Sequence, residues 1–466
     1  SYGHRLIFQR PNPTAAIALI VAERTDGKQL EFNDAYGAWK TWGDEQVRLQ
    51  PVGDGSWQLL NERGSMETYD SNGRLSAIEN RSVQRIDLAY DGTGRLATVT
   101  DDTGRTLASA HDAAGRVASM TDPLGNVTRY GYDAEGRLTH VTRPDDTPAD
   151  ATDDPTRTYL YENVDFPTAL TGIVDERGER FATYVYDADG KAINTSHGEG
   201  QDASEVAYNA DGTVSVTNAL GKVTTYTLET INGTPRVVRI DGEATTLCGA
   251  SVVEMTYDAN GYPASRTDEN GNVTTFVYNE RGLVEAETEA TGTPEERTTT
   301  TSWHPDFRVP VQIIRPGQTT DFTYDAAGRV LTRTVTDTQT QTTPFATTGN
   351  TRTTTWTYNA LGLVETVDGP RTDVVDLTTY TYDANGDLLR VTNALGHVTE
   401  IAARDARGQP TRTVDATGVV TRLAYDARGR LASRTVEAAT GDAVTTFEND
   451  GVGQLLRGTL PAGETP

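Results

Sequence analysis

Residues that could carry catalysis or bind metal are few and scattered in this chain of 466 residues. The densest group lies at residues 145–154, where five carboxylates fall within ten residues and could offer calcium hard oxygen ligands. This run lacks the glycine and the terminal glutamate of an EF-hand loop, so a solvated insertion is the favoured interpretation. The six histidines form no ligand cluster, and one cysteine, Cys248, permits neither an internal disulfide nor a zinc-binding spacing.

No Ser/His/Asp or Cys/His grouping stands at a plausible spacing, so a hydrolase is the weakest functional hypothesis. We predict no catalytic residue, no metal ligand and no cofactor. A net charge of −26 and a pI near 4.6 also argue against direct nucleic-acid binding, which needs a basic surface. The same charge keeps a large exposed sheet soluble.

A short motif, Tyr-Asp-x-x-Gly-Arg-Leu, recurs along the chain. Copies at Tyr69, Tyr90, His111 and Tyr132 follow one another at a step of 21 residues. A fixed period of this size indicates one supersecondary unit copied many times, and such arrays act through shape and surface rather than one catalytic pocket. The motif residues that we single out are Tyr69, Asp70, Gly73, Tyr90, Asp91, Gly94, Arg95, Asp112, Gly115, Tyr132, Asp133, Gly136, Arg137, Tyr186, Asp187, Tyr257, Asp258, Tyr324, Asp325, Gly328, Tyr382, Asp383, Tyr425, Asp426 and Gly429.

Each motif has the chemistry of a tight turn. Asp at its first turn position can accept hydrogen bonds from backbone amides two residues on, and Gly at the fourth supplies the positive φ of a type I turn followed by a bulge. A second turn signal lies half a period later, as at residues 122–126, so the chain reverses every 10 or 11 residues. One copy of the motif has Arg404 in place of the tyrosine.

The segments between turns alternate in polarity and are rich in Val, Thr, Tyr and Leu, for example at residues 96–100 and 273–278. This pattern predicts an all-β fold of short antiparallel strands joined by hairpins. The regular period favours a structural role for the tyrosines, as cross-strand pairs, over a ladder that binds carbohydrate or peptide. The arginine after each turn glycine is expected to pair with acidic groups of the turns and to help fix the register.

Three further stretches affect how the chain is divided. Residues 13–23 form the most apolar run, which is too short to span a bilayer and lacks the basic start of a signal peptide, so a buried strand is favoured. Residues 338–356 are rich in Thr and Gln and fit either an extended hairpin or a loose loop. We expect residues 1–54 to lead into the array and residues 55–466 to form one continuous β-sheet.

The motif copies at residues 90, 132 and 425, the variants at 111 and 324, and the turn at 122–126 together resemble the RHS/YD repeat family. The resemblance implies a long sheet that spirals into a hollow cocoon around a C-terminal toxin, delivered from a bacterial cell by type VI secretion or by a toxin complex. Related repeats build the barrel of teneurin adhesion receptors. The implied partners are the toxin cargo, the remaining shell segments of the same precursor, and a secretion spike or chaperone.

The chain departs from the full family plan. We find no spike-docking or transmembrane region before the array, and neither the family's repeat-associated core nor a toxin domain after it. We therefore expect this chain to be part of a shell, to be non-enzymatic and to be secreted as an effector. Such a part of a shell would have open sheet edges, so we expect other segments to cap these edges or the chain to associate with a second copy. Asp122-Pro123 resembles the family's aspartyl protease motif, but that site needs two carboxylates, and an ordinary turn is favoured. The alternative function is an adhesion or carbohydrate-binding surface.

Overall fold

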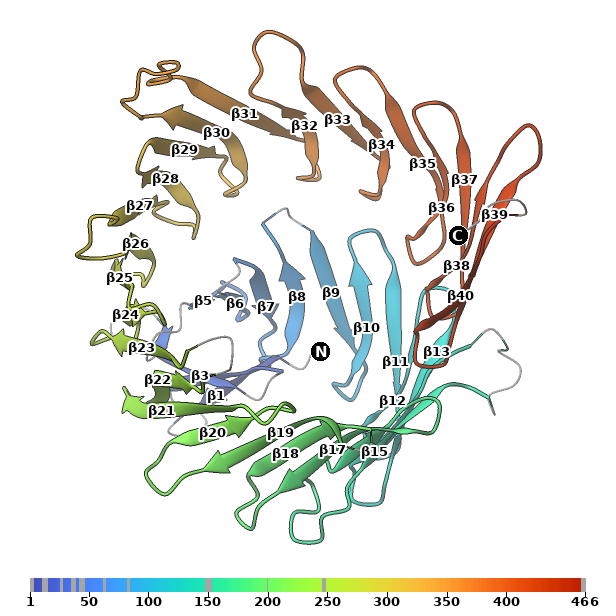
Figure 1. Ribbon diagram of the computed structural model, residues 1–466. Helices are drawn as coiled ribbons and strands as arrows, with labels where there is room; N and C mark the ends of the chain where they lie inside the picture. Colours follow the sequence, from blue (N-terminus) through green and yellow to red (C-terminus); the bar gives the residue numbers. More distant parts are fainter. Residues whose placement is uncertain are drawn as a thin grey trace. The chain divides into compact units, whose positions relative to one another are not determined.

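The computed structural model describes residues 4–10, 16–25, 28–34, 39–41, 47–61, 64–81, 84–145, 147, 153–198, 200–244 and 249–461. Within these ranges the chain consists of β-strands and turns and contains no helix, so the predicted all-β class is confirmed (Figure 1). Contacts divide the chain into two compact units. The first holds residues 1–89, 227–380 and 393–395, and the second holds residues 90–226, 381–392 and 396–466.

The strands of the first unit are β1 (Arg5–Gln9), β2 (Leu19–Glu23), β3 (Gln29–Asn33), β4 (Lys40–Thr41), β5 (Arg48–Pro51), β6 (Trp57–Leu60), β7 (Met66–Tyr69), β8 (Leu75–Glu79), β22 (Thr234–Gly242), β23 (Ser251–Tyr257), β24 (Pro263–Thr267), β25 (Val273–Tyr278), β26 (Val284–Glu289), β27 (Arg297–Trp303), β28 (Pro310–Arg315), β29 (Gln318–Tyr324), β30 (Val330–Asp337), β31 (Thr351–Tyr358) and β32 (Val364–Asp368). Three strands contain residues of both units: β9 (Arg85–Tyr90), β21 (Val223–Ile231) and β33 (Leu377–Tyr382).

The strands of the second unit are β10 (Leu96–Asp101), β11 (Thr106–His111), β12 (Val117–Thr121), β13 (Val127–Tyr132), β14 (Leu138–Thr142), β15 (Thr156–Leu160), β16 (Gly172–Val174), β17 (Arg180–Tyr186), β18 (Ala192–His197), β19 (Gln201–Tyr208), β20 (Val214–Thr217), β34 (Leu388–Thr392), β35 (Val398–Arg404), β36 (Pro410–Val414), β37 (Val420–Tyr425), β38 (Leu431–Val436), β39 (Ala443–Asn449) and β40 (Leu455–Thr459). Successive strands pair antiparallel, for example β10 through β15 and β34 through β40.

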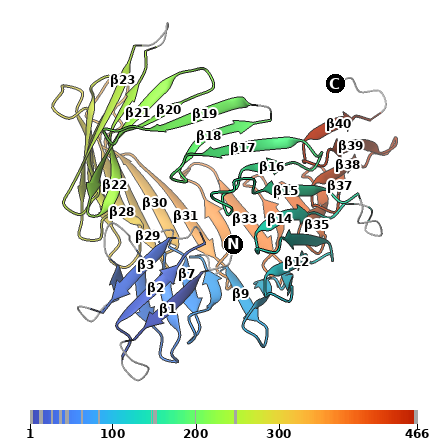
Figure 2. The same cartoon turned by 90° about the horizontal axis from the view of Figure 1, so that it is seen from below.

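The first unit begins with a separate four-stranded antiparallel sheet, β1-β2-β3-β4, that covers one face of β5–β8 (Figure 2). Alternate residues of these strands turn inward, and the main apolar core lies between the two layers. The ring of Trp57 lies 5.8 Å from Phe8 and 5.4 Å from Trp39. Ile20 and Phe32 are fully buried in this core. Residues 19–23 of the predicted apolar run form β2, and residues 11–15 lie outside the described ranges.

A buried ion pair fixes the two layers to each other. Arg24, just after β2, donates through both terminal guanidinium nitrogens to the carboxylate of Glu67 in β7, at 2.6 and 2.7 Å. The hydroxyl of Tyr69 donates to the same carboxylate at 2.5 Å. Glu67 is 2% exposed, so these polar groups compensate one another in the core. Tyr69, a motif tyrosine, is fully buried here.

Residues 338–350 connect β30 and β31 as an irregular loop, and regular structure resumes at Thr351. This settles the part of residues 338–356 that the sequence left open: the first portion is a loop and the rest belongs to β31. The boundary between residues 1–54 and 55–466 stays a prediction.

Candidate functional site: clasps between successive turns

The motif turns are closed by their own aspartates. At residues 112–116 the backbone amide of Gly115 donates to the carbonyl of Asp112 at 3.0 Å, and the amide of Asp112 donates to the carbonyl of Arg116 at 2.9 Å. Gly115 has a φ of 87°, which a residue with a Cβ rarely adopts. The pairing register shifts between Ala110 and His111, so the turn carries the bulge that the sequence predicted.

In the turns that carry an arginine on the aspartate, at Asp70, Asp112, Asp133, Asp325 and Asp426, the aspartate side chain makes two kinds of contact. One oxygen of Asp112 accepts from the backbone amide of Arg116 at 2.9 Å, and the other accepts from its Nε at 2.7 Å. The backbone amide and then the guanidinium of Arg116 hold the pKa of Asp112 below its usual value. In the motif turn of the preceding repeat, the amide of Arg95 and the hydroxyl of Thr93 lower the pKa of Asp91 to about 2.

The same arginine then contacts the next repeat. The guanidinium of Arg116 lies 4.5 Å from the ring centre of Tyr132, within the range of a cation–π contact. Arg329 lies 4.6 Å from Tyr358 in the same way, and Lys191 replaces the arginine over Tyr208 at 5.0 Å. The turn arginine therefore joins the aspartate of its own turn to the aromatic ring of the following one.

The tyrosine completes the link by donating its hydroxyl to the backbone of the preceding repeat. The acceptor is the carbonyl of the residue that opens the strand after the earlier turn. Tyr132 donates to Val117 at 2.9 Å, and Tyr358 donates to Val330 at 2.8 Å. The same position accepts the hydroxyls of four further tyrosines: Tyr161 to Leu138, Tyr208 to Ala192, Tyr324 to Pro310 and Tyr425 to Pro410. Two tyrosines donate to other backbone positions, Tyr186 to Leu170 just before β16 and Tyr257 to Val237 inside β22.

Two repeats make the same bond with a different donor. The indole nitrogen of Trp303 donates to the carbonyl of Val284 at 2.8 Å. Arg404, which stands where other copies of the motif have tyrosine, donates to the carbonyl of Leu388 at 2.7 Å. The position therefore selects a long side chain that ends in a donor. We call the set of turn aspartate, turn arginine and following donor a clasp.

A second group of contacts joins segments of the second unit that are distant in sequence. Arg407 donates to the carboxylate of Asp122 at 2.6 Å, and Arg105 pairs with Asp387. Burial alone would raise the pKa of Asp122, but Asn126 and Arg407 hold it below its usual value. Asp122 therefore forms an ion pair with Arg407. The turn that resembles a protease motif thus contacts a distant segment of the second unit.

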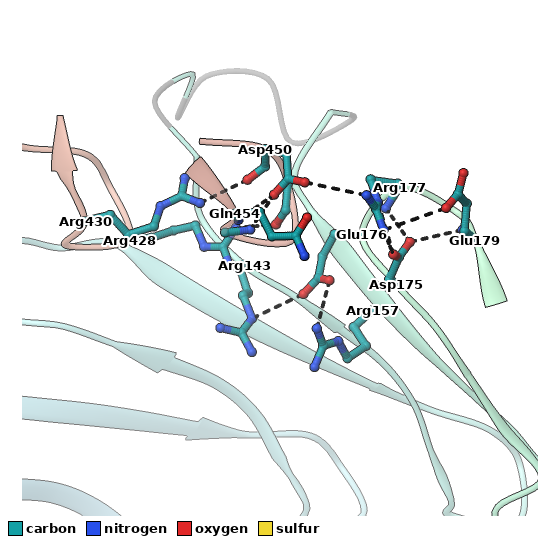
Figure 3. A network of polar contacts seen from close by, with 12 residues as sticks. Arg143, Arg157, Asp175, Glu176, Arg177, Glu179, Arg428, Arg430, Asp450 and Gln454 are labelled. Carbon is teal, nitrogen blue, oxygen red and sulfur yellow. Dashed lines mark hydrogen bonds and ion pairs between the residues drawn. The ribbon is translucent and has the colours of Figure 1, made fainter. Parts of the chain in front are cut away.

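Figure 3 shows the largest of these contacts, around the buried carboxylate of Glu176. Arg157 lies 3.0 Å and Arg143 lies 3.8 Å from this carboxylate, whose side chain is 0% exposed. Arg430 donates to the carbonyl of Asp450 at 3.0 Å, and Arg177 lies 3.8 Å from the Asp450 carboxylate. Turns near β15–β17 therefore meet the turn between β39 and β40. Motif spacing gives no signal for such contacts.

Two other groups that the sequence singled out are the acidic run at residues 145–154 and Cys248. Asp145 accepts hydrogen bonds from the hydroxyl and the backbone amide of Thr147. Residues 146 and 148–152 of the acidic run lie outside the described ranges. Cys248 also lies outside them. Among the residues that the structure describes, no group of three or more His, Cys, Asp or Glu side chains could hold a metal ion. In the same part of the chain, no helix has the length and apolarity to cross a membrane.

A β-hairpin fastened to its neighbour by a recurring clasp defines a protein of repeated antiparallel hairpins. The RHS repeat family model matches residues 69–106, 111–148, 257–294 and 404–442 of the chain. The chain therefore carries RHS repeats at these four stretches, and the repeat type that the motif resembles is confirmed there. No curated protein matches the chain.

Several solved structures resemble the chain weakly. The crystal structure of TcdB2-TccC3-TEV is 14% identical over 98% of this chain and 27% of that chain, with a TM-score of 0.49. TcdB2-TccC3 without its hypervariable C-terminal region gives the same identity and shares, with a TM-score of 0.47. The Photorhabdus luminescens Tc holotoxin pore is 14% identical over 98% of this chain and 30% of that chain, with a TM-score of 0.29. The chain thus spans less than a third of the length of these proteins.

Proposed function

We propose that the chain is a wall segment of a shell that encloses a polypeptide cargo, a C-terminal toxin in the plan of the RHS family. The observation that carries this proposal is the clasp, which recurs at the turns of Asp112, Asp133 and Asp325 and fastens those hairpins to the next ones, in a chain that matches the RHS repeat at four stretches. Repeats linked in this way form an extended surface rather than a pocket. The wall would isolate its cargo by steric exclusion.

The polar side chains of the sheet suit such a wall because many of them satisfy one another. Cross-strand threonine pairs share hydrogen bonds at 3.0 Å for Thr100 with Thr106, and at 2.9 Å for Thr334 with Thr353. Groups already paired offer only weak and unspecific contacts to a non-native chain. The tyrosine hydroxyls are likewise used by the clasps, which disfavours the alternative of a tyrosine ladder that binds carbohydrate.

The finer parts of the proposal follow the family plan. The cargo and the remaining shell segments would belong to the same precursor, and open sheet edges would be capped by those segments or by a second copy. A secretion spike or chaperone would complete the particle. Delivery from a bacterial cell would proceed by type VI secretion or by a toxin complex, and the chain itself would be non-enzymatic.

Limited proteolysis of the full-length parent protein tests the proposal. The cargo region should be cleaved much more slowly inside the parent than when the same region is expressed alone. A shell opened by guanidinium should lose this protection together with the strand structure of the wall. Equal cleavage rates in the parent and in the isolated cargo would reject encapsulation and leave the RHS repeat assignment intact.

A further inference from the structure

A cavity of about 370 Å³ lies in the first unit, between β5–β8 and the turns that follow β27 and β29. Strand alternation explains its position. Leu49, Trp57 and Leu59 turn toward the core under the N-terminal sheet and are buried. Their neighbours Arg48 and Leu60 point to the opposite face and line the cavity, so the cavity occupies the face of β5–β8 that the N-terminal sheet leaves open.

Positive charge gathers around this cavity. Arg48, Arg81 and Arg308 line it, together with the acidic residues Glu79 and Asp306. Glu79 is already engaged with an arginine of β9, at 3.7 Å. Neither Arg48 nor Arg81 makes a hydrogen bond or ion pair with another residue of the described ranges. In a chain of net charge −26, two arginine side chains that have no acidic partner among the described residues form an unusual surface.

A fourth arginine, Arg281, adds positive charge close to the cavity. Arg281 donates to the carbonyls of His304 and Pro305 at 2.5 and 2.8 Å, and to that of Phe307 at 3.1 Å. These bonds hold the loop that forms one wall of the cavity. Burial, and then the nearby positive charge of Arg48, lower the pKa of Arg281, and the carboxylate of Asp306 offsets this in part. The like charges are thus close enough to repel, which an anion between them would relieve.

The rest of the lining is apolar and is held in place. Leu60, Met66, Phe307 and two alanines of the turn after β29 supply it. The ring centre of Phe307 lies 4.9 Å from that of His304, and a Cβ at Gly328 would approach the Phe307 ring to within 2.8 Å. The glycine therefore makes room for the ring, and the apolar wall exists before any ligand binds. The volume falls at the lower end of small-ligand sites.

We propose that this cavity binds a carboxylate attached to an apolar body, with Arg48 and Arg81 on the carboxylate and the Phe307 side on the apolar part. Planar guanidinium groups pair with carboxylates through two parallel hydrogen bonds, which gives both affinity and orientation. Such a ligand is either a small aryl carboxylate or an acidic residue beside an apolar one in a polypeptide.

Saturation-transfer NMR and calorimetry on the whole chain test this with three probes: naphthylacetate, naphthylethanol and acetate. Naphthylacetate should bind at least about tenfold more tightly than either analogue, because each analogue lacks one half of the recognised chemistry. The double variant Arg48→Gln/Arg81→Gln should lose about tenfold in naphthylacetate affinity. The control Arg390→Gln/Arg422→Gln removes two arginines outside the cavity and should bind like the parent.

Equal binding of naphthylacetate and naphthylethanol would overturn the proposal, as would equal loss in the double variant and its control. Unchanged circular dichroism would show that each variant folds. Competition by the end-capped peptide Leu-Phe-Glu, but not by Leu-Phe-Gln, would assign the site to a polypeptide ligand. Failure of both peptides alongside tight naphthylacetate binding would assign it to a small carboxylate.

Discussion

Replacing Glu67 by glutamine tests how the N-terminal sheet is held on the array. The carboxylate lies in the core and accepts both guanidinium bonds of Arg24 and the hydroxyl of Tyr69. Its side chain is 2% exposed and that of Arg24 is 16% exposed. Glu67→Gln keeps the volume but removes the charge, so a buried guanidinium loses its compensating anion.

The expected loss follows from the burial. Removing one partner of a buried ion pair destabilises by about 3–5 kcal/mol, because the remaining charge stays in a medium of low polarity. We expect the loss to appear as local opening of β1–β3 away from β5–β8, because the pair lies between these layers. Repeat arrays do not unfold as one two-state unit, so a local probe is needed.

Acid should weaken the same contact in the parent chain. Burial by itself raises the pKa of Glu67, but hydrogen bonds from His4, Arg24 and Tyr69 outweigh it and hold the pKa well below its usual value. A lowered folded-state pKa means that the stabilisation is complete above the unfolded-state pKa and is lost as the pH falls through the folded-state one. Glu67→Gln should remove this acid dependence.

Hydrogen exchange measured by mass spectrometry is the assay. The matched control is Glu254→Gln, which breaks a 2.5 Å pair with Arg239 whose side chains are 53% and 41% exposed. The control should leave exchange nearly unchanged because exposed pairs contribute little. Faster exchange in β1–β3 for Glu67→Gln alone is the expected result. Equal exchange in the two variants would refute the assignment of this pair as the main polar link between the layers.

Three further predictions follow from the turns and clasps. Gly73→Ala should release the N-terminal sheet, because a Cβ there meets a backbone carbonyl of β1. Gly104→Ala, at a similar φ with open space around it, should show only the backbone cost of about 1–2 kcal/mol, and hydrogen exchange in the flanking strands compares the two variants. Tyr358→Phe should lose about 1 kcal/mol with its hydrogen bond to β30, and Tyr380→Phe, whose hydroxyl donates to no described residue, should lose less, as measured by hydrogen exchange in the strands that flank each position. Asp91 should titrate at about 2 by carboxyl NMR, so that its turn weakens only as the pH falls toward that value; an ordinary titration would contradict the turn geometry.

Much of the local structure could be predicted because it depends on neighbours in sequence. Asp at the first and Gly at the fourth turn position act within five residues, as at 112–116, so the turns and the all-β class follow from the motif. Val- and Thr-rich alternation places the strands between them. The resemblance to the RHS repeat, which the family model matches at four stretches, follows from the same recurrence.

The remaining contacts depend on spacing in three dimensions, for which the motif has no signal. Arg407 and Asp122 are 285 positions apart and meet only because two stretches of turns lie against each other within the second unit. Arg404 takes the place of a tyrosine because both side chains can carry a donor to the same carbonyl. A search for tyrosine alone misses this equivalence.

The most direct test of the central claim is a cryo-electron microscopy map of the full-length parent protein. We predict a wall of clasped antiparallel hairpins that surrounds density for the cargo polypeptide. A map in which the wall is folded while the cargo lies outside it, as an independently folded domain, would contradict encapsulation.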